Sequence, residues 1–268
     1  MVSPFQGCRD RIERAYAHRK ALGEIWNKLV NENFYQILVN VEHDGTGTIS
    51  VEQLNPLPVS CALELGETLY NFRAALDGCI YRAAIIESKQ NPPPGENRLE
   101  FPVCSNAAEF LKSARKIEPL SQKCRDFIES IQPYHTPELP AELYIRNFNR
   151  NLGILHDWAR KDRHRQLHVV GCWGSQASPS IRLPAGTSLK SIRACTDGFL
   201  EYEHEIASFE IDGFVPGMKV QANPDLMIDI AVNETPKPCA DNDTLGNRLT
   251  YIGETVEVTV CTIEHLCS

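Results

Sequence analysis

The stretch CALELGETLYNFRAALDGCIYRAAII, residues 61–86, decides the fold, because no proline interrupts the chain between Pro58 and Pro92. Apolar or small side chains recur along it at alternating steps of four and three residues, which is the spacing of a helix with one buried face. The residues on that face are Leu65, Leu69, Phe72, Leu76, Cys79, Ala83 and Ile86. The pattern therefore predicts a long core helix from about Pro58 to Ser88.

Two charged residues lie close to the apolar face of this helix. Arg73 is about 40° from Leu69 on a helical wheel, and Asp77 follows one turn later. Such charges need either a buried partner or a ligand, because an unpaired buried charge is costly. Asp77 has the spacing to pair with Arg73 within the helix. Asp162 interrupts the apolar face of a later predicted helix, so a buried Arg73–Asp162 pair is a second hypothesis, and a ligand site is the alternative.

The whole chain predicts an α+β fold, with an N-terminal helical bundle and a C-terminal antiparallel β-rich region. The other helices are expected at about 4–31, 106–116, 120–131 and 141–166. An inserted β-hairpin is expected at about 34–53, with strands 34–43 and 48–53.

Beyond residue 168, short β-branched runs alternate with Gly, Pro and Asn/Asp turns, which is typical of strands. The segment 248–267 is ambiguous, since TVEVTV favours a strand and TIEHLC favours a helix. We expect residues 1–168 to form the bundle and residues 169–268 to pack with it as one unit. The hairpin could join the C-terminal sheet.

The net charge of −8 lies entirely in residues 169–268, which hold 6 Lys/Arg and 14 Asp/Glu. This argues against a general nucleic-acid coat protein but leaves room for a local basic site. No apolar run approaches the ~18 residues that a membrane-spanning helix needs. The N-terminus also lacks the apolar segment of a signal peptide. We therefore expect a cytoplasmic location without membrane association.

The chain has 10 cysteines, and no two of them form a C-x-x-C pair. Without export, reduced thiols that act as small apolar side chains are the preferred interpretation. The ligand spacing of a zinc framework is missing, so we expect no metal ion and no cofactor.

The common catalytic signatures are absent, among them G-x-S-x-G, G-x-x-x-x-G-K-[ST] and H-E-x-x-H. What remains is a basic cluster at the end of the helix predicted at 141–166. Its residues are Arg160, Lys161, Asp162, Arg163, His164, Arg165 and His168. Positive charge there complements the helix dipole, which is the structural interpretation. In the functional interpretation an Arg stabilises phosphorane charge and a His moves a proton, with Arg163 and His168 or Arg160 and His164 acting on a phosphodiester.

The segments LGETLYNFRAALDGCIYRAA (65–84) and RKDRHRQL (160–167) resemble a broad group of uncharacterised bacterial proteins with an "ALDH" helix and a "DKHR" helix end. The first segment is also similar to the HEPN superfamily of helical bundles. There, an Arg, four intervening residues and a His form a metal-independent ribonuclease site. Many members are toxins or antiviral effectors that act as dimers. The resemblance covers about residues 1–168.

Transferred to this chain, the resemblance puts the Arg at Arg73 and the His at position 78, where the chain has Gly78. The resemblance therefore implies a nucleotide- or RNA-binding module that does not cleave, and a homodimer is a further expectation. The alternatives are a ribonuclease that uses Arg163, His164 or His168, and a purely structural dimerisation module. The expected binding residues are Arg73, Asp77, Arg160, Asp162 and Arg165.

Overall fold

A computed structural model describes residues 3–32, 34–136, 147–165, 167, 169–173, 179–194, 198–200, 202–224, 228–233 and 244–267. The fold is α+β, as predicted. The chain divides into two compact units. Unit 1 is Met1–Gly23, Ala62–Leu167 and Gly246–Ser268, and unit 2 is Glu24–Cys61 and His168–Leu245. The hairpin region therefore belongs with the C-terminal strands, and the C-terminal helix belongs with the bundle.

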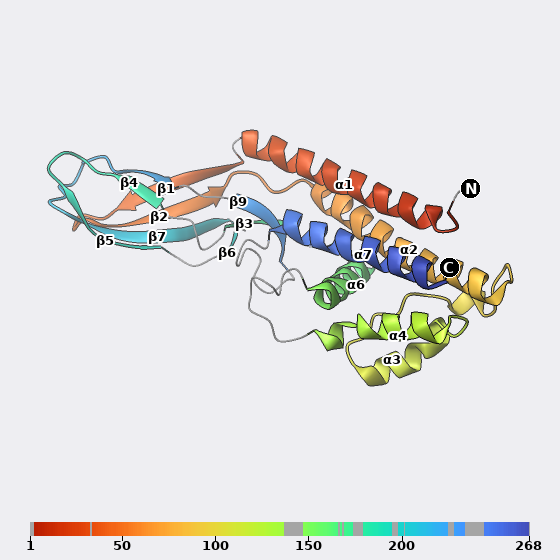
Figure 1. Ribbon diagram of the computed structural model, residues 1–268. Helices are drawn as coiled ribbons and strands as arrows, with labels where there is room; N and C mark the ends of the chain where they lie inside the picture. The colour runs from red at the N-terminus through yellow and green to blue at the C-terminus, as the bar shows by residue number, and fades with distance from the viewer. Residues whose placement is uncertain are drawn as a thin grey trace. The chain divides into compact units, whose positions relative to one another are not determined.

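Six α-helices occur in the described part of the chain, and Figure 1 shows α1, α2 and α7 running side by side. They are α1 (Gln6–Asn31), α2 (Val59–Ser88), α3 (Ala107–Ser113), α4 (Gln122–Ser130), α6 (Phe148–His164) and α7 (Leu245–Cys267). Short 3-10 turns are η1 (Glu96–Arg98), η2 (Ala114–Lys116) and η3 (Pro133–His135). The predicted core helix is confirmed as α2. The first part of the helix predicted at 141–166 lies outside the described residues.

The core of unit 1 forms around α2. Six of its seven predicted core positions, all except Ile86, are fully buried. On α1, Tyr16 stacks edge-on against Phe72, with ring centroids 5.5 Å apart. On α7, Gly253 lies against Tyr16, because a Cβ added there would meet the Tyr16 hydroxyl oxygen at 2.5 Å.

The ambiguous segment 248–267 is helical, within α7. Its buried side chains recur at steps of three and four residues: Leu249, Ile252, Val256, Val260 and Ile263. The hydroxyl groups of Thr255 and Thr259 donate to carbonyls one turn earlier, at 2.7 Å each, so these buried polar groups are satisfied within the helix. Burial of this face overrides the β-propensity of TVEVTV.

Unit 2 is built from antiparallel strands. The larger sheet has the order β1 (Tyr35–Val41), β2 (Thr46–Gln53), β7 (Glu203–Asp212), β5 (Ser188–Ala194). A second sheet has the order β6 (Gly198–Leu200), β3 (Val169–Trp173), β9 (Ile228–Val232), and β4 (Pro179–Arg182) pairs with β8 (Gln221–Pro224). The predicted hairpin is confirmed, with Val39 opposite Ile49, and it joins the C-terminal strands through the β2–β7 pairing.

One expectation about the cysteines is wrong, because Cys172 in β3 is disulfide-bonded. Seven described cysteines are free thiols: Cys8, Cys61, Cys79, Cys104, Cys124, Cys261 and Cys267. The expectation relied on the missing export signal and on the absence of C-x-x-C pairs, whereas disulfide partners can lie far apart along a chain. The inference from a missing export signal to reduced thiols therefore fails at Cys172. Within the described residues, no helix combines the length and apolar character that crossing a membrane requires.

Candidate functional site

Arg73, in the middle of α2, is the centre of a polar cluster in unit 1. Its side chain is 8% exposed, and its Nη2 donates to Asp77 Oδ1 at 2.9 Å and to Glu100 Oε1 at 3.2 Å. Nη2 also donates to the Phe101 carbonyl, and the Phe101 N–H donates to Asp77 Oδ1 at 3.0 Å. Lys116 Nζ lies 2.8 Å from Glu100 Oε2. The predicted Arg73–Asp77 pair is thus confirmed, and it ties the segment after η1 to α2.

Helix α6 adds His156 to this cluster. A Cβ on Gly66 of α2 would lie 2.5 Å from Asp162 Oδ2, so the two helices touch there. Arg73 is two turns further along α2, and His156 is nearly two turns back along α6, which is about 10 Å in each case. The charge of Arg73 acts on His156, so the two residues lie near each other, and together with the contact at Gly66 this gives α2 and α6 opposite directions.

The electrostatics of His156 agree with that position. Burial, and next the positive charge of Arg73, lower the pKa of His156 to about 4. Arg160 and Arg163 lower it further, whereas Glu100 opposes them. At pH 7 the imidazole is therefore neutral.

Two buried nitrogen atoms in this cluster have no hydrogen-bond partner among the described residues. They are Nη1 of Arg73 and Nδ1 of His156. Most buried polar groups in proteins are paired, so two such atoms in one cluster call for an explanation. We use the name Arg73–His156 cluster for Arg73, Asp77, Glu100, Lys116, His156 and Arg163.

The carboxylates of the cluster respond to the same charges. Burial raises the pKa of Asp77, against the opposing effects of Arg73, the Phe101 N–H and Arg163. Burial also acts to raise the pKa of Glu100, but Lys116 and Arg73 outweigh it and hold that pKa below its usual value. Arg163 therefore acts on both Asp77 and His156, which joins part of the predicted basic helix end to Arg73.

The predicted Arg73–Asp162 pair is wrong. Asp162 lies against Gly66, two turns of α2 away from Arg73, and it accepts a hydrogen bond from the Leu167 N–H. Burial raises the pKa of this carboxyl. The prediction placed the right helices together, but the register of α6 on α2 puts His156, rather than Asp162, beside Arg73.

The other predicted site residues divide into those near the cluster and those away from it. Arg160 lies on the His156 face of α6 and pairs with Asp157 at 3.5 Å. His164 and Arg165 are exposed at the end of α6, where the Arg165 N–H donates to the Lys161 carbonyl at 2.8 Å. His168 lies outside the described residues.

Three members of the cluster were missed by sequence reasoning. His156 precedes Arg160 by one turn and Arg163 by two turns, so helical spacing alone could have found it. Glu100 and Lys116 lie in a proline-rich connection and a 3-10 turn, where no periodicity relates them to α2.

Position 78 does not face the cluster. A Cβ on Gly78 would lie 3.6 Å from Cys8 Sγ on α1. Five residues after Arg73, this position is about 140° around the helix from it. A histidine here would therefore point toward Cys8 and not toward Arg73.

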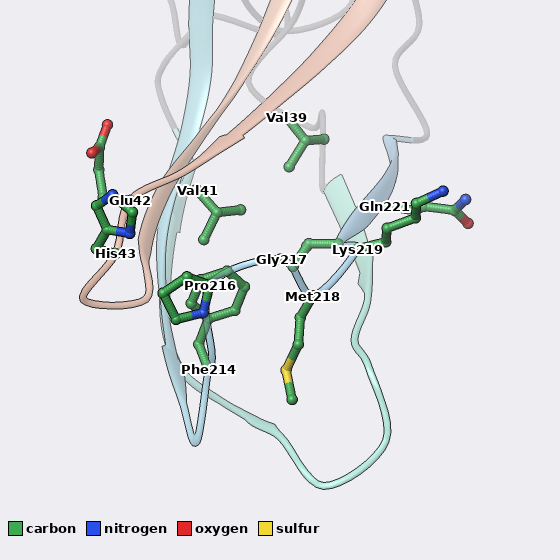
Figure 2. Close-up of a pocket in the computed structure, with 11 residues that line it drawn as sticks. Val39, Val41, Glu42, His43, Phe214, Pro216, Gly217, Met218, Lys219 and Gln221 are labelled. Atoms are coloured by element: carbon green, nitrogen blue, oxygen red, sulfur yellow. The ribbon is translucent and has the colours of Figure 1, made fainter.

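A second candidate is a pocket of about 440 Å³ in unit 2. Figure 2 shows Val41 of β1 near Phe214 and Pro216, which precede β8, and Val39 and Met218 also line the pocket. Glu42, His43, Lys219 and Gln221 supply polar groups. Such a lining suits a small, mostly apolar group. None of the predicted site residues lines it.

No protein-family model, curated protein or solved structure matches the chain. The HEPN-like resemblance therefore stays a prediction, and the Arg73–His156 cluster must be interpreted through its own geometry.

Proposed function

We propose that unit 1 binds a phosphate group of a nucleotide or RNA at the Arg73–His156 cluster and does not cleave it. The observation that carries this proposal is the unpaired Nη1 of the buried Arg73, in the same cluster as the unpaired Nδ1 of His156, whose pKa responds to the Arg73 charge. A buried donor without a partner costs about 1–3 kcal/mol, which a ligand oxygen would remove. Phosphate oxygens are preferred acceptors for the guanidinium group.

The cluster reaches solvent through its other members. The side chains of Asp77 and Glu100 are 35% and 40% exposed, and Arg163 is exposed on α6. A phosphate that binds the buried Nη1 of Arg73 must therefore displace these partly exposed side chains, with Arg163 beside it. Because Asp77 and Glu100 already neutralise part of the positive charge, we expect a small number of phosphate contacts. The salt dependence of binding should be correspondingly shallow, about −0.7 in log–log slope for each contact with single-stranded RNA.

The same cluster is poorly suited to proton transfer. A general acid or base works best with a pKa near the operating pH, whereas His156, with a pKa of about 4 in the free protein, is neutral at pH 7 and lacks the acidic proton of an imidazolium. Gly78 supplies no second imidazole. These two facts favour binding over the ribonuclease alternative.

The test compares two substitutions of arginine, each of which removes one positive charge from the same end of α6. Arg163→Ala removes a charge that acts on the cluster, whereas Arg165→Ala removes one beyond the last turn of α6. Fluorescence anisotropy with a labelled single-stranded RNA and calorimetry with ATP would measure both affinities. We expect about tenfold weaker binding for Arg163→Ala, the loss of one charged hydrogen bond, and less than twofold for Arg165→Ala.

Three other outcomes of this test would contradict the proposal or favour one of its alternatives. Equal losses in both variants would indicate unspecific attraction and contradict the proposal. Cleavage of the labelled RNA that persists in EDTA and disappears in Arg163→Ala would establish the ribonuclease instead. If the protein neither binds nor cleaves these ligands, the structural dimerisation module remains as the alternative. Light scattering of the protein as it elutes from a size-exclusion column would then show whether it dimerises.

A further inference from the structure

Three helix ends of unit 1 bring two thiols and a carboxylate together. Cys124 in the first turn of α4 is fully buried, Cys267 is the last residue of α7, and Glu87 is in the last turn of α2. Cys124 Sγ lies 3.5 Å from Cys267 Sγ and 3.7 Å from Glu87 Oε1. The three ligand atoms all lie within 4.8 Å of one another. Both cysteines are free thiols.

These separations match the edges of a tetrahedron around zinc. With Zn–S distances of about 2.3 Å and a Zn–O distance of about 2.0 Å, two sulfurs lie ~3.8 Å apart and a sulfur and an oxygen ~3.5 Å apart. The observed 3.5 Å and 3.7 Å need only small side-chain rotations to fit.

The charges around the three groups also favour a cation. Glu87 forms no ion pair with any residue that the structure describes, so its carboxylate faces the two thiols without a basic partner. Helices α2 and α7 both end at this point, and the C-terminal ends of their dipoles attract positive charge, against the opposite effect of the α4 N-terminus beside Cys124. Figure 1 shows the C-terminus of α7 near the last turns of α2.

We propose that Glu87, Cys124 and Cys267 form a Zn²⁺ site, with water in the fourth position. Two thiolates and one carboxylate select a thiophilic ion over Mg²⁺ or Ca²⁺. Three protein ligands leave one coordination position open. The ion ties the end of α7 to α2 and α4. This inference is independent of the phosphate-binding proposal.

The test uses the full chain, reduced and freed of metal. Titration with Cd²⁺ should give the ultraviolet absorption of a cadmium–thiolate complex, saturating at one ion per chain, and Zn²⁺ should displace it. Cys267→Ala, at the half-exposed chain end, and Glu87→Gln should each weaken binding by at least about tenfold. Cys261→Ala is the matched control, because Cys261 is exposed on the same helix and is not part of the site.

A second readout does not depend on the optical probe. Zn²⁺ should raise the thermal midpoint of the wild type and of Cys261→Ala, but not that of Cys267→Ala. Equal affinity and equal stabilisation in the wild type and Cys267→Ala would overturn the proposal. So would a Cys124–Cys267 disulfide found by mass spectrometry in protein freshly isolated from cells.

Discussion

Replacing Gly66 with alanine adds one methyl group at the point where α2 and α6 touch. In an unobstructed helix this change stabilises a protein by about 1 kcal/mol, because glycine is a poor helix former. Here the new Cβ would lie 2.5 Å from Asp162 Oδ2 and 3.0 Å from its Cγ. Asp162 cannot simply turn away, since its carboxylate accepts the Leu167 N–H.

The magnitude follows from these opposing effects. Overpacking costs about 1–3 kcal/mol, and the lost hydrogen bond costs about 1 kcal/mol more. The gain in helix propensity offsets part of these costs, so Gly66→Ala should lower the free energy of unfolding by about 1–3 kcal/mol. In an Asp162→Ala background the methyl group fits, so the same substitution should raise it by about 1 kcal/mol.

The assay is a double-mutant cycle by urea unfolding, followed by the helical circular dichroism signal. The two single variants, the double variant and the wild type give a coupling energy, which we expect to be about 2 kcal/mol or more. Stabilisation by Gly66→Ala in both backgrounds would refute the packing of Asp162 on Gly66. The register that places His156 near Arg73 would then lose its support.

Two further predictions test the electrostatics and the resemblance. The free energy of unfolding should fall as the pH drops from about 6.5 toward 4. In this range His156 binds a proton in the unfolded chain but stays neutral in the folded protein, where its pKa is about 4. His156→Gln should remove that part of the pH dependence, on the order of 1–3 kcal/mol after allowance for partial exposure, and identical slopes in thermal melts from pH 7 to 4 would contradict the assignment. Gly78→His restores the Arg-x4-His spacing but points toward Cys8. It should give no RNA cleavage in a gel assay and cost about 1–3 kcal/mol through overpacking; metal-independent cleavage would show that the imidazole reaches Arg73.

The sequence predicted the fold where periodicity was strong. The apolar spacing of α2 and the alternation of the hairpin each have a physical cause in burial of one face, and both elements appear as expected. The segment 248–267 could not be decided, because its β-branched residues and its helical spacing disagree. Packing of Val256 and Val260 in the core of unit 1 settles it in favour of a helix.

The candidate site was only half predictable. Arg73 and Asp77 are one turn apart on one helix, so their pairing follows from the sequence. Whether Asp162 or His156 is the neighbour of Arg73 depends on the axial register in which α6 packs on α2. That register follows from the contact at Gly66, which no pattern within either helix specifies. Glu100 reaches Arg73 through a loop, and loops carry no periodic signal.

The most direct test of the phosphate-binding proposal is the pKa of His156, measured by NMR on ¹⁵N-labelled imidazole with and without saturating ATP, with the resonance assigned through His156→Gln. In the free protein the pKa should be about 4. A phosphate bound at Arg73 places negative charge beside the imidazole and should move its pKa upward, toward the ordinary value. If ATP binds and the pKa of His156 does not move, the ligand lies elsewhere and the proposal is contradicted.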